Sequence, residues 1–181
     1  VAHIFGLDKP IVFNAQTTST MKDLFYRYDA LRHFQFSQNS STPLSNDELE
    51  QRFIRYQGLG KAIRSKKRAL VLIDEIDKAP RDLPNDVLAA LEDLAFDVPE
   101  IGKRYEADPT LKPIILLTSN SEKNLPDAFL RRVTYFHIPF PDKRLLLEIL
   151  KGKTKAFSET DLEAVVKHFE MIRQGCLLYT S

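Results

Sequence analysis

The sequence has little of what marks secreted, membrane-spanning or nucleic-acid-binding proteins. It contains one cysteine in 181 residues, which excludes an intrachain disulfide framework and a cysteine-rich zinc site. The formal net charge is +1, so the charge of the whole chain gives no argument for binding nucleic acid or a membrane surface. No apolar run is long enough to cross a bilayer. A cytoplasmic, reducing environment is the default expectation.

The strongest positive signal is an apolar run that ends in two carboxylates, residues 69–75 (ALVLIDE). Such a run predicts a strand buried on both faces, which is typical of parallel sheets. Ligands of open α/β sheets bind beyond the carboxyl ends of the strands, where Asp74 and Glu75 would lie. This is the pattern of a Walker B motif, in which the Asp helps to hold Mg²⁺ and the Glu polarises the attacking water. The same pattern also occurs where a strand simply meets solvent, so it needs support.

Two further segments supply that support. Residues 113–120 (PIILLTSN) form a second apolar run that ends in small polar residues. Its last residue, Asn120, is similar to the sensor 1 residue of AAA+ ATPases, which orients the lytic water. Residues 125–133 (LPDAFLRRV) resemble the short helix that carries the arginine finger in that class. The alternatives are that Ser and Asn form an ordinary turn and that both arginines are solvated surface charges.

Four strands separated by helices are expected, which predicts an α/β class with a parallel sheet. The expected strands are 11–14, 69–74, 113–117 and 133–138. Residues 96–108 predict a β-hairpin around residues 101–103. No internal repeat is apparent.

The helices are expected from apolar spacing and from capping residues. Residues 1–6 predict the end of a helix near Gly6. Ser19 or Thr20 is expected to cap a helix, residues 47–65 are expected to form one or two helices with a flexible middle at 56–60, and 37–46 an exposed loop. Later helices are expected from Asp82, from Asp142 and from Ser158.

Together these segments resemble the MoxR group of AAA+ ATPases over residues 1 to about 174. Residues 17–30 (TTSTMKDLFYRYDA), 76–80 (IDKAP) and 119–122 (SNSE) also look like this group. The resemblance implies a three-layer AAA+ P-loop NTPase fold, ATP hydrolysis, and chaperone-like remodelling of a client or adaptor protein. It implies a homo-oligomeric ring, usually hexameric, with no nucleic acid and no membrane span.

The resemblance also implies a role for each site residue. Asp74 would bind Mg²⁺ and, through it, ATP. Glu75 would polarise the lytic water and Asn120 would orient it. Arg132 is the favoured arginine finger, because it lies immediately before the expected strand 133–138, and Arg131 is the second candidate.

One departure from the family matters. The sequence contains no G-x-x-x-x-G-K-[ST] loop, which would hold the phosphates, so we expect an incomplete sheet without the P-loop strand. Residues 1–141 are expected to be a partial ATPase core and 142–174 the start of a helical lid. Helical spacing stops near residue 173, and the last six residues (CLLYTS) equal one reading frame of a sequencing adapter. We therefore expect 175–181 to be a non-native tail, and the fragment itself to be inactive.

Two other functions remain open from the residues. One is a non-catalytic assembly module that retains an ATPase fold. The other is a nucleic-acid-directed AAA+ motor, against which the near-neutral charge stands. Nucleotide binding by the full-length protein distinguishes the first of these from an enzyme.

Overall fold

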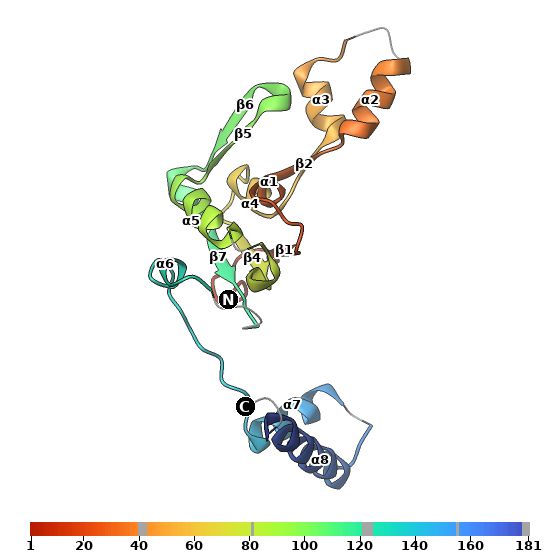
Figure 1. Ribbon diagram of the computed structural model, residues 1–181, viewed down its shortest axis with the longest axis vertical. Coiled ribbons are helices and arrows are strands. Elements are labelled where there is room, and N and C mark those ends of the chain that lie inside the picture. Colours follow the sequence, from red (N-terminus) through yellow and green to blue (C-terminus); the bar gives the residue numbers. More distant parts are fainter. Residues whose placement is uncertain (40–42, 81, 121–124, 155, 179–181) are drawn as a thin grey trace. The chain divides into compact units, whose positions relative to one another are not determined.

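The computed structural model describes residues 1–39, 43–80, 82–120, 125–154 and 156–178, with side chains described up to residue 175. The chain divides into two compact units, Val1–Thr134 and Tyr135–Ser181 (Figure 1). Within the described ranges, no helix is both long and apolar enough to span a membrane.

The first unit is built on a parallel sheet of three strands. They are β1 (Ile11–Asn14), β4 (Leu70–Asp74) and β7 (Ile114–Leu117), in the order β1-β4-β7. The central strand, β4, is the predicted apolar run, and its Val71 and Ile73 are fully buried. Asn14 pairs with Asp74 and Ile73 with Leu117, so all three strands end at one edge of the sheet. The α/β class and its parallel sheet are confirmed.

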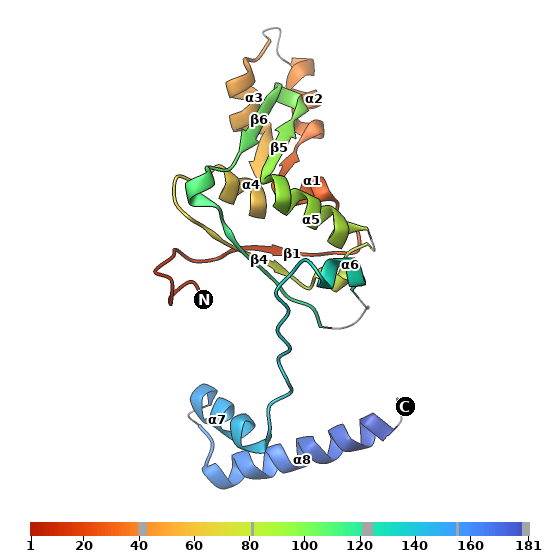
Figure 2. The ribbon, with the colours of Figure 1, turned by 90° about the vertical axis from the view of Figure 1, so that its left-hand side faces the viewer.

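Three helices gather on one side of this sheet, as Figure 2 shows. They are α1 (Met21–Phe25), α4 (Gly58–Ile63) and α5 (Leu83–Asp93). Thr20 begins α1 with a capping box, in which its hydroxyl accepts from the Asp23 N–H and the Asp23 carboxylate accepts from the Thr20 N–H. Asp82 precedes α5 as predicted, although its side chain makes no capping hydrogen bond. Pro84 occupies the first turn of that helix.

A pair of antiparallel strands that the sequence did not predict lies at the two ends of the chain segment between α1 and α4. Strands β2 (Tyr26–Tyr28) and β3 (Ile54–Tyr56) pair with each other. Between them along the chain lie α2 (Ala30–Asn39) and α3 (Asn46–Phe53). Of the exposed loop expected at 37–46, residues 40–42 lie outside the described residues.

The flexible middle expected at residues 56–60 is wrong. Gly58, Leu59 and Gly60 are buried and begin α4. A Cβ on Gly60 would lie 1.9 Å from the carbonyl oxygen of Phe25. Glycine is needed here because α4 packs directly against the backbone of α1, and a residue with a Cβ would not fit. The role of Gly60 is therefore close packing, not backbone flexibility.

The predicted hairpin is confirmed. Strands β5 (Ala95–Val98) and β6 (Lys103–Glu106) pair antiparallel. They are joined by the 3₁₀ turn η2 (Pro99–Ile101) and by Gly102, whose φ of 61° requires the left-handed region. A second 3₁₀ turn, η3 (Pro109–Leu111), leads into β7.

Residues 1–7 form the hydrogen-bonded turn that typically ends a helix, although no helix is formed there. The Leu7 N–H donates to the Ala2 carbonyl at 2.9 Å and the Gly6 N–H to the His3 carbonyl at 3.3 Å. These two bonds form a Schellman motif, and Gly6 takes the positive φ of 61° that the motif needs.

The fourth strand expected at 133–138 is wrong. This segment pairs with no strand among the described residues. Tyr135, Phe136 and Ile138 are 65%, 80% and 80% exposed. The sheet has the order β1-β4-β7, and residues 133–138 pair with the outer edge of neither β1 nor β7. An extended segment without a neighbour gains no ladder of hydrogen bonds to hold it.

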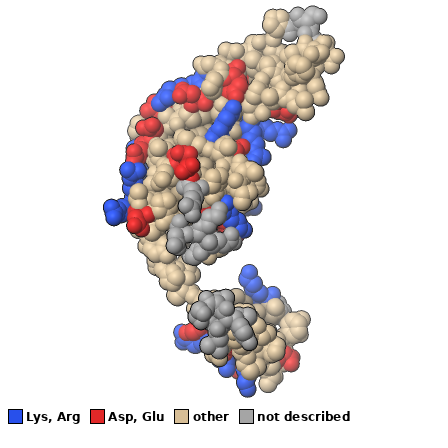
Figure 3. All heavy atoms as spheres, in the orientation of Figure 1, with Lys and Arg blue, Asp and Glu red and all other residues tan. Residues whose placement is uncertain are grey.

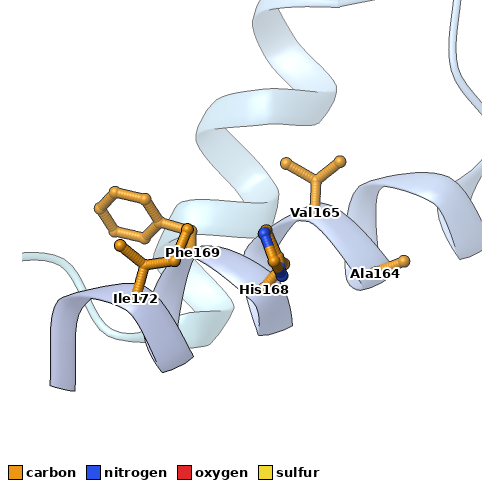
Figure 4. Close-up of a pocket in the computed structure, with 5 residues that line it drawn as sticks. All are labelled: Ala164, Val165, His168, Phe169 and Ile172. Atoms are coloured by element: carbon orange, nitrogen blue, oxygen red, sulfur yellow. The ribbon is translucent and has the colours of Figure 1, made fainter. Parts of the chain in front are cut away.

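The second unit contains two helices that contact each other, α7 (Lys143–Lys153) and α8 (Glu159–Leu178). The Asp142 carboxylate caps α7 by accepting from the Leu145 N–H at 2.8 Å. Ser158 and Asp161 form the predicted capping box. Helix α8 continues past residue 173, where the apolar spacing of the sequence stops. Of the predicted tail, 175–181, the last three residues lie outside the described residues. One face of α8 carries an apolar hollow, lined by Ala164, Val165, His168, Phe169 and Ile172 (Figure 4).

A charged network joins the β2–α2–α3–β3 segment to the hairpin. The carboxylate of Glu50, on α3, accepts hydrogen bonds of 2.8 Å from Tyr56, Arg64, Lys103 and Tyr105. Burial raises the pKa of Glu50, but the hydrogen bonds from Lys103 and the two tyrosines and the charge of Arg64 outweigh burial and hold the pKa at about 2. The carboxylate is thus stabilised in its ionised form.

This network predicts an acid-sensitive fold. The pKa of Glu50 is lower in the folded state than its ordinary 4.5, so its contribution to stability is complete above pH 4.5 and is lost as pH falls toward 2. Urea unfolding should therefore show Glu50→Gln less stable than the wild type at pH 7, with the difference shrinking between pH 4.5 and 2. Glu92→Gln, on the exposed side of α5, is the control. A wild-type and Glu50→Gln difference independent of pH would contradict the assignment.

Candidate functional site

The carboxyl edge of the sheet brings together polar side chains from two neighbouring strands. Asp74 ends β4, and Thr118 follows β7 directly opposite, since Ile73 pairs with Leu117. The Thr118 hydroxyl donates to the Asp74 carboxylate and accepts from the Glu75 N–H at 3.0 Å. The sequence predicted Asp74, Glu75 and Asn120 at this edge but not the role of Thr118. Thr118 could have been found from its position, because it is the first residue after the apolar run of the neighbouring strand, where that strand meets the same edge of the sheet.

Glu75 is held at both carboxylate oxygens. Asn120 Nδ2 donates to Glu75 Oε1 at 2.9 Å across 45 residues of sequence. Lys78 Nζ lies 2.7 Å from Glu75 Oε2. Glu75 and Asn120, both predicted at this edge from the sequence, are thus joined by a direct hydrogen bond.

The backbone at Glu75 is strained. Its φ of 56° and ψ of 48° lie in the left-handed region, which costs a residue with a Cβ about 1–3 kcal/mol. Neighbouring bonds hold it there: the Ile76 N–H donates to the Thr118 carbonyl at 2.9 Å, and Ile76 is 1% exposed. The 3₁₀ turn η1 (Ile76–Lys78) follows at once. With the backbone turned in this way, the Glu75 side chain contacts both Asn120 and Lys78.

The third strand of the sheet, β1, also ends at this edge, beside Asp74. The Ala15 N–H donates to the Asp74 carbonyl at 2.9 Å, extending the ladder by one bond. Asn14 and Gln16 are exposed beside it. The Gln16 N–H donates to the hydroxyl of buried Ser19 at 2.9 Å, which shapes the loop before α1.

The edge is open to solvent. Asp74 and Glu75 are half-buried, and Thr118 and Asn120 are exposed. Figure 3 shows acidic and basic side chains interspersed over the visible surface of the first unit.

The two predicted arginines lie on a different element. Helix α6 (Asp127–Leu130) is anchored by Phe129, which is 2% exposed, and the short helix predicted there is confirmed. Arg131 is its C-terminal cap and Arg132 follows, and both are exposed. Among the described residues, no hydrogen bond or ion pair joins either arginine to Asp74, Glu75 or Asn120.

A metal ion at this edge would need ligands beyond the protein side chains. Within the described ranges, no group of three or more His, Cys, Asp or Glu residues is placed to hold one. Mg²⁺ is commonly bound by one or two carboxylates together with substrate phosphates and water. Thr118 engages one oxygen of Asp74, so this carboxylate fits a single-ligand role of that kind.

The sequence matches no protein-family model and no curated protein. Among solved structures, the chain is similar to a crystal structure at 2.00 Å resolution of a proposed ATPase from Cytophaga hutchinsonii, with 12% identity and a TM-score of 0.48. The alignment covers 87% of this chain and 44% of that protein. The chain therefore spans less than half the length of the protein it matches.

Proposed function

We propose that this chain is part of an AAA+ ATPase of the MoxR type, which couples ATP hydrolysis to the remodelling of a partner protein. The observation that carries the proposal is the 2.9 Å hydrogen bond from Asn120 to Glu75. It joins a candidate water-polarising carboxylate to a candidate water-orienting amide at the edge of a parallel sheet where ligands bind. The strained, fixed backbone of Glu75 also favours a functional role.

In this proposal each group at the edge has one task. Asp74 binds Mg²⁺ alongside the nucleotide phosphates, and its hydrogen bond from Thr118 fixes its orientation. The Glu75 carboxylate accepts a hydrogen bond from the lytic water and so polarises it. Asn120 holds Glu75 and orients that water. When bound, ATP would supply the phosphoanhydride bond that is cleaved, and Mg²⁺ would neutralise the charge of its phosphates.

In this proposal, the phosphate-binding amides would come from outside these 181 residues. The 181 residues contain no G-x-x-x-x-G-K-[ST] loop, and that loop normally holds the phosphates. Activity is therefore to be measured on the full-length protein. Mg²⁺-dependent ATP hydrolysis by that protein tests the proposal, and its absence in a correctly folded preparation contradicts it.

The ring and the arginine finger belong to the same proposal. Arg131 caps α6, the helix anchored by Phe129, and Arg132 follows it; both residues are exposed. An exposed arginine at the end of an anchored helix suits a finger that reaches the γ-phosphate of a neighbouring subunit, where it stabilises charge in the transition state. Arg132 stays the predicted finger from the family resemblance alone, with Arg131 the second candidate, because the strand 133–138 that it was expected to precede is not formed.

Mixed rings should reveal the finger. Full-length Arg132→Ala and Glu75→Gln subunits are each expected to lose turnover by about 10³-fold, the lower range for an arginine finger. A mixture should recover hydrolysis, because some interfaces pair an intact Arg132 with an intact Glu75. Arg131→Ala is the comparison and should lose less. If the mixture stays inactive while rings still form, Arg132 does not act between subunits.

A further inference from the structure

The turn that follows β4 carries a cation directed at Glu75. Lys78 is the last residue of η1, three residues after Glu75, and its backbone N–H donates to the Glu75 carbonyl at 2.9 Å. Its Nζ lies 2.7 Å from Glu75 Oε2. The two side chains are 37% and 32% exposed. Carboxylate and cation are thus joined within one backbone turn.

The other oxygen of the same carboxylate is held from the neighbouring strand. Asn120 donates to Glu75 Oε1 at 2.9 Å. A carboxylate has about four lone-pair sites on its two oxygens, so one donor on each oxygen leaves others for water. Rotating the Glu75 side chain away from this position would break both contacts. Its orientation is therefore set from two sides at once.

We propose that Lys78 is a positioning residue for hydrolysis, which holds the Glu75 carboxylate in the orientation from which it polarises water. This inference rests on the proposed function. Lys78 acts through Glu75 and does not contact the nucleotide. A half-exposed ion pair contributes little to folding, so the lysine serves the geometry of the site rather than the stability of the turn. Ile76 and Ala79, which are 1% and 2% exposed, anchor that turn independently.

The effect of losing Lys78 should appear in kcat. With only Asn120 to hold it, the Glu75 carboxylate samples other rotamers, and small misplacements of a catalytic group are costly. In the full-length protein, Lys78→Met is expected to lower kcat for ATP by about tenfold or more. The KM for ATP and the melting temperature should stay at their wild-type values. Lys78→Arg should restore much of kcat, because a guanidinium reaches the same carboxylate.

The control removes the same charge at the opposite end of the sheet. Lys112 is exposed just before β7, and Lys112→Met should leave kcat unchanged. A wild-type kcat in Lys78→Met would overturn the inference. So would a raised KM with unchanged kcat, which would place Lys78 on the nucleotide, or a lowered melting temperature without rescue by arginine. If the wild-type protein hydrolyses no ATP, the proposed function fails; if the wild type is active and Lys78→Met is equally active, the proposed function stands and the inference about Lys78 alone fails.

Discussion

Replacing Glu75 with glutamine in the full-length protein is expected to leave ATP binding intact and to abolish nearly all turnover. Glutamine keeps the size of the side chain and the Oε1 acceptor for Asn120, which donates to it at 2.9 Å in the structure. In the proposed function it removes the negative charge that would polarise water, an effect worth about 10²–10⁴-fold for a positioned general base. Phosphate release measures turnover, and titration with a fluorescent ATP analogue measures binding.

Asp74→Asn is the matched comparison, one residue earlier on the same strand. Its amide still accepts from the Thr118 hydroxyl but loses the charge that attracts Mg²⁺. We expect it to weaken Mg²⁺-dependent nucleotide binding, which Glu75→Gln leaves unchanged. Normal hydrolysis by the Glu75→Gln protein would refute the Walker B assignment, and equal binding defects in both variants would remove the distinction between their roles.

The parts of the fold that were predictable from sequence are those specified by local patterns. The continuous apolar run at β4 predicted a strand with a neighbour on each side, and β4 does lie between β1 and β7. Burial on both faces was predicted too, but Leu72 is only half-buried, and its register partners Val12 and Leu116 are 52% and 36% exposed. The capping boxes at Thr20 and Ser158 mark helix starts because their side chains satisfy specific backbone donors. Gly102 marks the hairpin turn because its φ of 61° suits glycine. In each case the residue's own chemistry restricts the backbone.

What could not be predicted depends on partners distant in sequence. Strands β2 and β3 are three residues each, too short to show an alternating pattern, and form because their ends are brought together by α2 and α3. Residues 133–138 have the composition of a strand but no neighbour among the described residues. At the site, apolar runs revealed Asp74, Glu75 and Asn120, whereas the contacts of Thr118 and Lys78 depend on strand register and on the left-handed turn at Glu75.

Gly60→Ala should be the most damaging single-methyl change in the first unit. In an open helix, replacing glycine with alanine stabilises by about 0.5–1 kcal/mol. Here the new Cβ would lie 1.9 Å from the Phe25 carbonyl oxygen, and backbone cannot rotate away as a side chain can. Helix α4 must therefore separate from α1, and overpacking of this kind costs about 1–3 kcal/mol or more.

Gly58→Ala, in the same helix, is the matched variant and should destabilise the fold less. Its Cβ would lie 3.2 Å from Phe13 Cβ, a close contact that a few tenths of an ångström of movement relieves. We therefore expect urea unfolding to rank the proteins as wild type, then Gly58→Ala, then Gly60→Ala, with the last destabilised by about 2 kcal/mol or more. The Gln57 N–H donates to the same Phe25 carbonyl at 2.8 Å, so separation of α4 from α1 also breaks this bond. Equal stabilities for the two variants, or a more stable Gly60→Ala protein, would show that α4 does not pack this closely against α1.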